Sequence, residues 1–206
     1  MDEHLKQILS KIRVLALENG IEIISIKSIC ERLDISEEKL GKYFKNDKDL
    51  VTKVLEFERD SFKGIFDEYD FEGMNAIDIL MIVSKEIASR FYDVTPTVSI
   101  LLKEKFPNEY QVHLQRRLDF IFGKIQINLT KGISQGIYRD DLSIELIARL
   151  YMSRLIDLHN EKIFPSDQFS FATLFEVMFD NFVRSVATEK GIKYFVRKKR
   201  GVKFSK

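Results

Sequence analysis

The chain has 206 residues, and its 33 Lys and Arg residues against 32 Asp and Glu residues give a formal net charge of +1 at pH 7. This balance excludes a general attraction to nucleic acid, so any polyanion binding must come from a local patch. The single cysteine, Cys30, excludes an internal disulfide and is consistent with a reducing, cytoplasmic location. The start Met1-Asp2-Glu3-His4 is too acidic for a secretory signal, and the sequence has no 18-residue apolar stretch that would predict a membrane span.

Three prolines and nine glycines are few for this length and favour helices over strands and turns. A first helix is predicted from apolar residues that recur at helical spacing, and Asn19-Gly20 is expected to end it. The face that this helix is expected to bury consists of Leu5, Ile8, Leu9, Ile12, Leu15 and Ala16.

Two short helices are predicted after it. Ser25 is placed to cap the first, and Ser36 is placed to cap the second, which should cover about residues 37–44. The segment Asp34-Ile35-Ser36 between them is expected to form a tight turn, and a long fourth helix is expected to begin at Asn46 or Asp47. The side chains of the short helices that should point inward are Ile26, Ile29, Cys30, Leu33, Leu40 and Phe44.

The rest of the chain is predicted to be helical as well. We expect an all-α fold of about nine helices, with the later ones over residues 75–92, 97–104, 109–135, 143–159 and 167–188. Residues 190–206 hold eight basic residues and no acidic one, and we interpret residues 191–206 as a solvated basic tail.

Two short helices joined by a tight turn, with a helix on either side as a frame, are typical of a helix-turn-helix DNA reader. The exposed face of the second short helix should then carry donors for phosphates and base edges. The residues predicted to contact DNA are Ser25, Lys27, Ser36, Lys39, Lys42, Tyr43, Lys45 and Lys48.

About the first 50 residues resemble the N-terminal domain of the TetR/AcrR family of transcription regulators. The resemblance runs through Leu15-Ala16-Leu17-Glu18-Asn19-Gly20, Ser25-Ile26-Lys27-Ser28-Ile29-Cys30, Ile35-Ser36 and Tyr43-Phe44-Lys45-Asn46-Asp47-Lys48-Asp49-Leu50. Downstream, residues 131–142 (KGISQGIYRDDL) look like a loop that is frequent in the variable C-terminal domain of that family.

The resemblance implies a homodimer with a DNA-binding domain over residues 1–48 and a ligand-binding and dimerisation domain over residues 49–190. Each DNA-binding domain would read one half of a double-stranded, near-palindromic operator. The chain departs from the family at Asp34, where glycine is usual, and at Asp47, where a phosphate-binding lysine is common and Lys48 stands next to it as a substitute. It also carries Glu37-Glu38 at the start of the second short helix.

The family places dimerisation on the last two long helices, where two broad apolar stripes occur. The residues predicted to form the dimer interface are Tyr151, Arg154, Leu155, Leu158, Phe171, Leu174, Phe175, Met178 and Phe182, and an internal core is the alternative for the apolar ones. Arg154 and Asp157 have the i, i+3 spacing at which side chains of one helix can pair, and they could cross the dimer axis or simply face solvent. Aromatic candidates for an effector pocket are Phe91, Tyr92, Tyr110, Phe120 and Tyr151.

Catalysis has no support, because the sequence contains no nucleophile elbow and no Gly-rich phosphate loop. The three histidines have no metal spacing, no cofactor is expected, and His113 is expected at the surface or in a capping role. Two hypotheses remain. The first is a repressor that a small-molecule effector releases from its operator, and the second is a TetR-like helical dimer that has lost specific DNA binding and serves in ligand sensing or protein interaction.

Overall fold

The computed structural model describes residues 2–19, 24–90, 102–165 and 167–201. The predicted all-α fold is confirmed: the described residues form no named strand, and one isolated antiparallel bridge pairs Tyr138 with Ala187. Helices with described bounds are α1 (Glu3–Asn19), α2 (Ile26–Leu33), α3 (Glu37–Gly41), α4 (Asp47–Glu68), α5 (Ala76–Arg90), α7 (Pro107–Ser134), α8 (Ile144–Asp157), α9 (Phe171–Val186) and α10 (Glu189–Gly201).

The chain folds as two compact units. The first, here called the head unit, comprises residues 1–67 and 93–117, and the second, the body unit, comprises residues 68–92 and 118–206. The division differs from the predicted boundary at residue 48, because most of α4 and the first turns of α7 belong with α1, α2 and α3.

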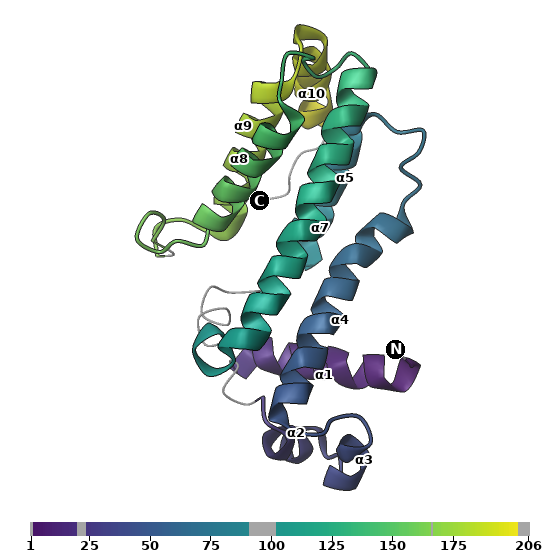
Figure 1. Cartoon of the computed structure of the whole chain (residues 1–206), viewed down its shortest axis with the longest axis vertical. Coiled ribbons are helices and arrows are strands. Elements are labelled where there is room, and N and C mark those ends of the chain that lie inside the picture. The colour runs from purple at the N-terminus through teal and green to yellow at the C-terminus, as the bar shows by residue number, and fades with distance from the viewer. Residues whose placement is uncertain (1, 20–23, 91–101, 166, 202–206) are drawn as a thin grey trace. The chain divides into compact units, whose positions relative to one another are not determined.

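In the head unit, α1, α2 and α3 gather around the first turns of α4 (Figure 1). Their shared core follows the helical spacing of the sequence, since the predicted apolar faces of α1 and of the two short helices meet there. The fully or nearly fully buried side chains of this core are Ile8, Leu9, Ile12, Ala16, Ile24, Ile29, Leu40, Phe44, Leu50, Val51, Val54, Leu55 and Leu102.

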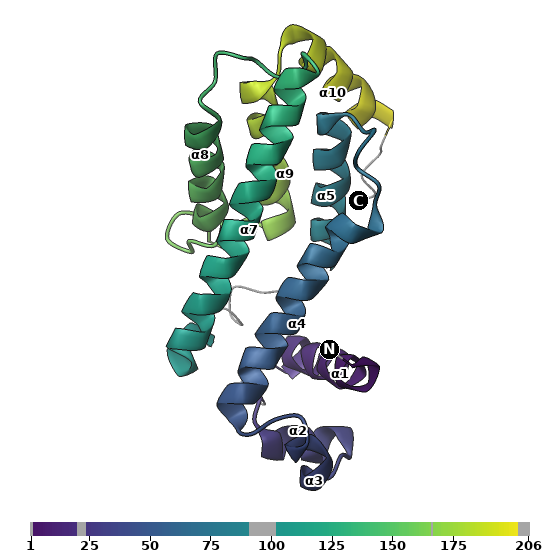
Figure 2. The ribbon, with the colours of Figure 1, turned by 45° about the vertical axis from the view of Figure 1, so that its right-hand side comes forward.

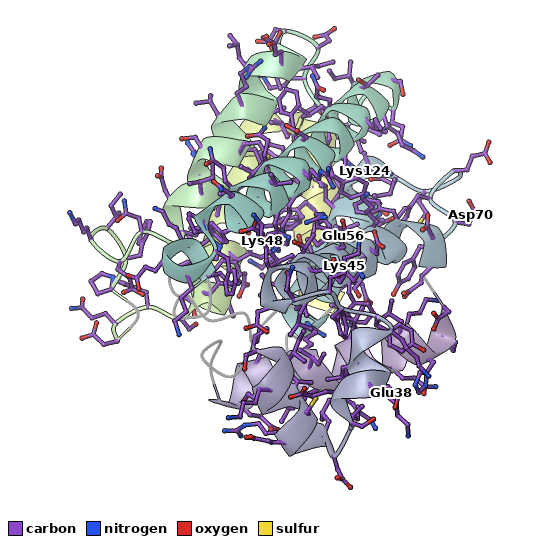
Figure 3. All side chains as sticks on the ribbon, turned by 60° about the horizontal axis from the view of Figure 1, so that its bottom comes forward. Glu38, Lys45, Lys48, Glu56, Asp70 and Lys124 are labelled. Atoms are coloured by element: carbon purple, nitrogen blue, oxygen red, sulfur yellow. The ribbon has the colours of Figure 1, made fainter. Side chains whose placement is uncertain are left out.

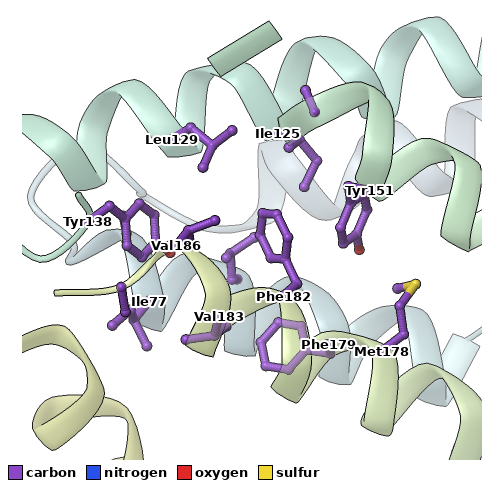
Figure 4. Packing of buried hydrophobic residues seen from close by; sticks show 14 of the residues in the cluster. Ile77, Ile125, Leu129, Tyr138, Tyr151, Met178, Phe179, Phe182, Val183 and Val186 are labelled. Carbon is purple, nitrogen blue, oxygen red and sulfur yellow. The ribbon is translucent and has the colours of Figure 1, made fainter. Parts of the chain in front are cut away.

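In the body unit, α5, α8, α9 and the later part of α7 enclose a second core (Figures 2 and 4). Figure 4 shows Leu129 and Ile125 of α7 facing Val186 and Phe182 of α9. The aromatic ring of Tyr151 on α8 meets Phe182 edge to face, with their centroids 4.7 Å apart.

Residues 189–201 form the helix α10, so the interpretation of residues 191–206 as a solvated tail is wrong for residues up to 201, and residues 202–206 lie outside the described part. The side chain of Phe195 is buried and packs on Phe179 of α9 with ring centroids 6.1 Å apart. Lys199 pairs with Asp180 at 3.0 Å, and the hydroxyl of Tyr194 donates to Asp78 of α5 at 2.5 Å. The basic run is helical because its apolar and aromatic residues recur at helical spacing and its lysines reach acidic partners on α9 and α5.

The segment after α7 folds back tightly onto that helix. Gly136 has φ +66, a left-handed conformation that glycine adopts without strain, and it follows the end of α7, near the end of the helix predicted over residues 109–135. The amides of Ile137 and Tyr138 both donate to the carbonyl of Gly132 at 3.0 Å. The ring of Tyr138 occupies the space that a side chain at Gly132 would need, and its hydroxyl donates to Asn128 at 3.2 Å.

This packing predicts opposite effects for two glycines of α7. Gly132→Ala should lower the free energy of unfolding by about 1–3 kcal/mol, because the added methyl group meets the ring of Tyr138 in a filled core. Gly123→Ala is the control: nothing lies within 4 Å of its added carbon, so it should raise stability by about 0.5–1 kcal/mol. Urea unfolding of both variants measures the difference, and a stabilising Gly132→Ala would contradict the packing.

Candidate nucleic-acid interface

The helix-turn-helix is built from local capping interactions. Ser25 caps α2 by accepting a hydrogen bond from the Ser28 amide at 3.2 Å, and Ser36 caps α3 by accepting one from the Lys39 amide at 3.4 Å. Asp34, between the helices, has φ 52 and ψ 47, which is the left-handed conformation that the turn requires. An aspartate tolerates this conformation better than most residues, so the turn forms without the usual glycine.

The second short helix depends on its neighbours for stability. α3 spans only Glu37–Gly41, shorter than the predicted 37–44, and so few residues do not form a stable helix in water. Leu40 and Phe44 are buried against α1 and α4 and provide the tertiary packing that the short helix needs.

Two polar residues of α4 fasten the segment after α3. The ammonium group of Lys53 donates to the backbone carbonyl of Tyr43 and lies 3.1 Å from the Asp49 carboxylate. Asp49 also accepts a hydrogen bond from the Lys45 amide at 2.9 Å. This backbone hydrogen bond, together with Lys53, holds the pKa of Asp49 below its ordinary value, so the carboxylate is charged and engaged at neutral pH.

Asp47 has a structural role at the position where the family commonly has a phosphate-binding lysine. Its carboxylate accepts a hydrogen bond from the Ile26 amide at 2.8 Å and so satisfies a free N–H at the start of α2. The same carboxylate lies in the first turn of α4, where a negative charge is favourable. Asp47 therefore ties α2 to α4 through this hydrogen bond.

The cations predicted to contact DNA are solvent-exposed, as a contact surface requires. Lys27, Lys39, Lys42 and Lys45 are all exposed. Figure 3 shows Lys45 and Lys48 near the start of α4 and Glu38 on α3. Lys48 is also exposed, but its ammonium group pairs with Glu109 of α7 at 2.9 Å.

Tyr43 and the two predicted capping serines belong to the framework as well as to the predicted contact set. The ring of Tyr43 is partly buried, with its centroid 5.8 Å from that of His4 on α1. Glu37 and Glu38 are exposed in the first turn of α3. The surface around α3 thus carries both signs of charge.

The aromatic residues predicted for an effector pocket lie partly outside the described residues, and the described ones belong to both units. Phe91 and Tyr92 lie outside the described residues. Tyr110 packs beside the head core, whereas Phe120 and Tyr151 belong to the body unit. Burial raises the pKa of the Tyr151 hydroxyl far above its ordinary value, so this group is neutral and can donate a hydrogen bond.

The body unit has a groove of about 820 Å³, and none of the aromatic residues predicted for the effector pocket lines it. It lies between α10 and the segments next to α5 and α7, and it is open to solvent. Its lining consists of Gly73, Asn75, Gln135, Ile137, Glu189, Lys190, Lys193, Tyr194 and Arg197.

A buried polar cluster on α4 and α7 was missed at the level of sequence. His113 is buried, which corrects its expected surface position, and its Nδ1 lies 3.2 Å from both Arg59 Nη1 and the Leu55 carbonyl. Burial, with Arg117 and Arg59 nearby, lowers the pKa of His113 to about 4, so the ring is neutral at pH 7. The spacing Glu109, His113, Arg117 places all three on one face of α7 and was the signal that could have revealed the cluster.

Most of the predicted interface residues are part of the core of a single chain. Tyr151, Leu158, Phe175, Met178 and Phe182 are buried within the body unit, because the stripes that they form face α5 and α7. For these five residues, burial within one chain supports the alternative of an internal core, and their part in a dimer interface stays a prediction. Among the remaining predicted interface residues, Arg154 is exposed, and Leu155, Phe171 and Leu174 are partly exposed.

The opposite faces of α8 and α9 expose apolar side chains that the prediction left out. Leu146 and Leu150 on α8 and Val177 on α9 are each more than half exposed. They lie on the side of each helix turned away from the buried stripe, and Leu146 and Leu150 are one helical turn apart on α8.

Within the described residues, no group of three or more His, Cys, Asp or Glu side chains is arranged to hold a metal ion. In that same part of the chain, every helix is too short or too polar to cross a membrane.

Solved structures share this architecture at low sequence identity. A TetR transcription regulator from Haloarcula marismortui ATCC 43049 superposes with a TM-score of 0.71 at 13% identity, over 89% of this chain and 97% of that one. The fatty acid degradation regulator FadR from Bacillus halodurans superposes at 0.66 with 14% identity, over 89% and 96% of the two chains. A TetR-family regulator from Agrobacterium tumefaciens gives 0.65 at 16% identity, over 91% and 100%. None of the protein-family models matches the chain, and no curated protein sequence matches it.

The chain therefore has the fold of the TetR-type transcription regulators, as the resemblance of its first 50 residues predicts. In this fold the segment from α2 to α3 is the helix-turn-helix, and its framework in this chain is the set of caps and α4 contacts described above.

The role of Asp47 predicts a difference between two substitutions. Asp47→Ala should lower the free energy of unfolding by about 1 kcal/mol, because it removes the acceptor for the Ile26 amide. Asp47→Asn keeps an acceptor oxygen and should retain most of the stability. Thermal unfolding measures both, and equal stability of the alanine and asparagine variants would show that the hydrogen bond contributes nothing.

Proposed function

We propose that the chain is a DNA-binding transcription regulator that inserts α3 into the major groove of a double-stranded operator. The observation that carries the proposal is the set of exposed lysines, Lys39, Lys42 and Lys45, on and just after a short helix held rigidly by α1 and α4. A rigid frame favours DNA binding, because the lysines are presented in one arrangement and little ordering is needed on contact. The shared fold of TetR-type regulators supports this assignment.

The regulator acts as a repressor, and a small molecule bound to the helices outside the helix-turn-helix releases it from the operator. An effector of this kind acts only if it binds the two conformations of the regulator with different affinity. Tyr151 is a candidate contact for the effector, since its neutral hydroxyl is a polar group within a mostly apolar cluster.

The DNA-binding role of the exposed lysines predicts weaker electrostatic binding when two of them are neutralised. The double variant Lys39→Gln/Lys42→Gln should bind duplex DNA more weakly, and the slope of log K against log salt should fall by roughly 0.9 for each phosphate that the variant no longer neutralises. Fluorescence anisotropy with labelled DNA from upstream of the chain's own gene measures both quantities. Lys162→Gln, an exposed lysine of the body unit, is the control and should leave binding unchanged.

The second candidate function is a TetR-like dimer that has lost specific DNA binding, and the exposed carboxylates of Glu37 and Glu38 on α3 favour it. The same titration separates the two functions. A wild-type chain that fails to bind the upstream DNA even at low salt would contradict the repressor and leave this alternative.

The regulator is a homodimer that pairs through the exposed faces of α8 and α9. Leu146, Leu150 and Val177 support this choice, because a stable dimer interface needs apolar side chains that the protomer itself leaves in water. The buried stripes of the same two helices are already used by the core of one chain.

If the dimer forms through the exposed faces of α8 and α9, a charged side chain introduced at Leu150 should disrupt it. Leu150→Asp should convert the chain to a monomer without unfolding it, because the Leu150 side chain is 57% exposed in the protomer and leaves no cavity. Val112→Asp on α7, at a residue that is 49% exposed, is the matched control and should remain dimeric. Sedimentation equilibrium gives the masses, and a dimeric Leu150→Asp variant would exclude this interface.

A further inference from the structure

Lys48 belongs to the predicted DNA-contact set, and its side chain has a carboxylate partner on α7. Its Nζ lies 2.9 Å from Glu109 Oε1. The two side chains differ in exposure: that of Lys48 is 65% exposed, whereas that of Glu109 is only 12% exposed. The hydrogen bond from Lys48 lowers the pKa of Glu109, so the carboxylate is charged at neutral pH. The lysine can therefore leave for another anion, while the carboxylate stays in place.

The position of Glu109 is set by the packing of α7 against α4 in the head unit. His113 follows Glu109 by one helical turn and contacts Arg59 and the Leu55 carbonyl, each at 3.2 Å. Arg117 follows by another turn, with its guanidinium 5.1 Å from the centroid of the Phe62 ring. These contacts fix the register of the two helices and keep the carboxylate beside the first turn of α4.

A single lysine matters for DNA binding by residues 1–50 because the net charge of this segment is low. Residues 1–50 contain nine Lys or Arg and ten Asp or Glu residues, so the DNA-reading segment has no excess of positive charge. Binding to DNA draws most of its non-specific free energy from lysines and arginines that displace counterions from phosphates. A lysine paired with a fixed carboxylate must break that ion pair when it binds phosphate. Its contribution to the free energy of DNA binding is therefore smaller by the free energy of the broken pair.

We propose that Glu109 competes with DNA phosphate for Lys48, so that α7 sets how strongly the head unit binds DNA. This inference rests on the proposed function, since it assumes that the head unit binds DNA. A movement of α7 that separates Glu109 from Lys48 increases affinity, and a movement that tightens the pair decreases it. The carboxylate thus acts as an internal mimic of phosphate at the edge of the DNA-reading surface.

The experiment is a double-mutant cycle on the full chain, read out by anisotropy with a labelled duplex at several salt concentrations. Glu109→Gln should tighten binding by about two- to fivefold, which is the range of an exposed ion pair. Its salt slope should steepen by roughly 0.9 for each phosphate that the released Lys48 neutralises. Lys48→Gln should weaken binding, and the double variant should match Lys48→Gln because Glu109 then has nothing to hold.

Two further variants keep the test decisive. Glu189→Gln removes an exposed pair, Glu189 with Lys193 at 2.7 Å on α10 in the body unit, and should leave DNA binding unchanged. Glu109→Asp retains the charge on a shorter side chain and should lie between wild type and Glu109→Gln, even if the glutamine variant is less stable on melting.

The competition would be overturned if Glu109→Gln and Glu109→Asp bound DNA as wild type does. It would also be overturned if the effect of Glu109→Gln persisted in the Lys48→Gln background. A wild-type chain without DNA binding would contradict the proposed function itself, and the inference with it.

Discussion

The recognition segment depends on its attachment to the first turns of α4. A helix of five residues has no stability of its own, so α3 keeps its shape only through tertiary contacts. Leu40 and Phe44 supply the apolar part of that attachment. Lys53, which reaches the carbonyl of Tyr43 and the carboxylate of Asp49, supplies the polar part. A displacement of the start of α4 therefore also displaces α3, and the proposed regulation of DNA binding requires this linkage.

Acidic residues near the surface predicted to contact DNA have three different roles. Asp47 and Asp49 accept hydrogen bonds from backbone amides and hold the start of α4 in place, so their charge serves the frame. Glu37 and Glu38 are exposed on α3 and face whatever the helix contacts. Glu109 differs from both, because it holds a lysine of the same surface. Three of the carboxylates in or next to this segment, those of Asp47, Asp49 and Glu109, are thus engaged by groups of the chain itself.

Local structure was predictable from sequence wherever a residue type has one dominant conformational role. The cap at Ser25, the left-handed turn at Asp34 and the end of α7 at Gly136 follow from such preferences. Periodicity marks an apolar helix face without showing what covers it, so it does not reveal that the stripe containing Phe182 is buried in the core of one chain. The spacing of Glu109, His113 and Arg117 indicates that they share one face of α7, but the spacing alone does not show that α4 covers that face and buries His113.

The measurement that most directly tests the account is protection of DNA against dimethyl sulfate, which methylates guanine N7 in the major groove and adenine N3 in the minor groove. A duplex from upstream of the chain's own gene would be probed with and without the protein. Insertion of α3 from both protomers predicts two clusters of protected guanine N7 atoms, about 10 base pairs apart or at a multiple of that spacing. Full reactivity of every guanine N7 while the protein is bound would contradict the account.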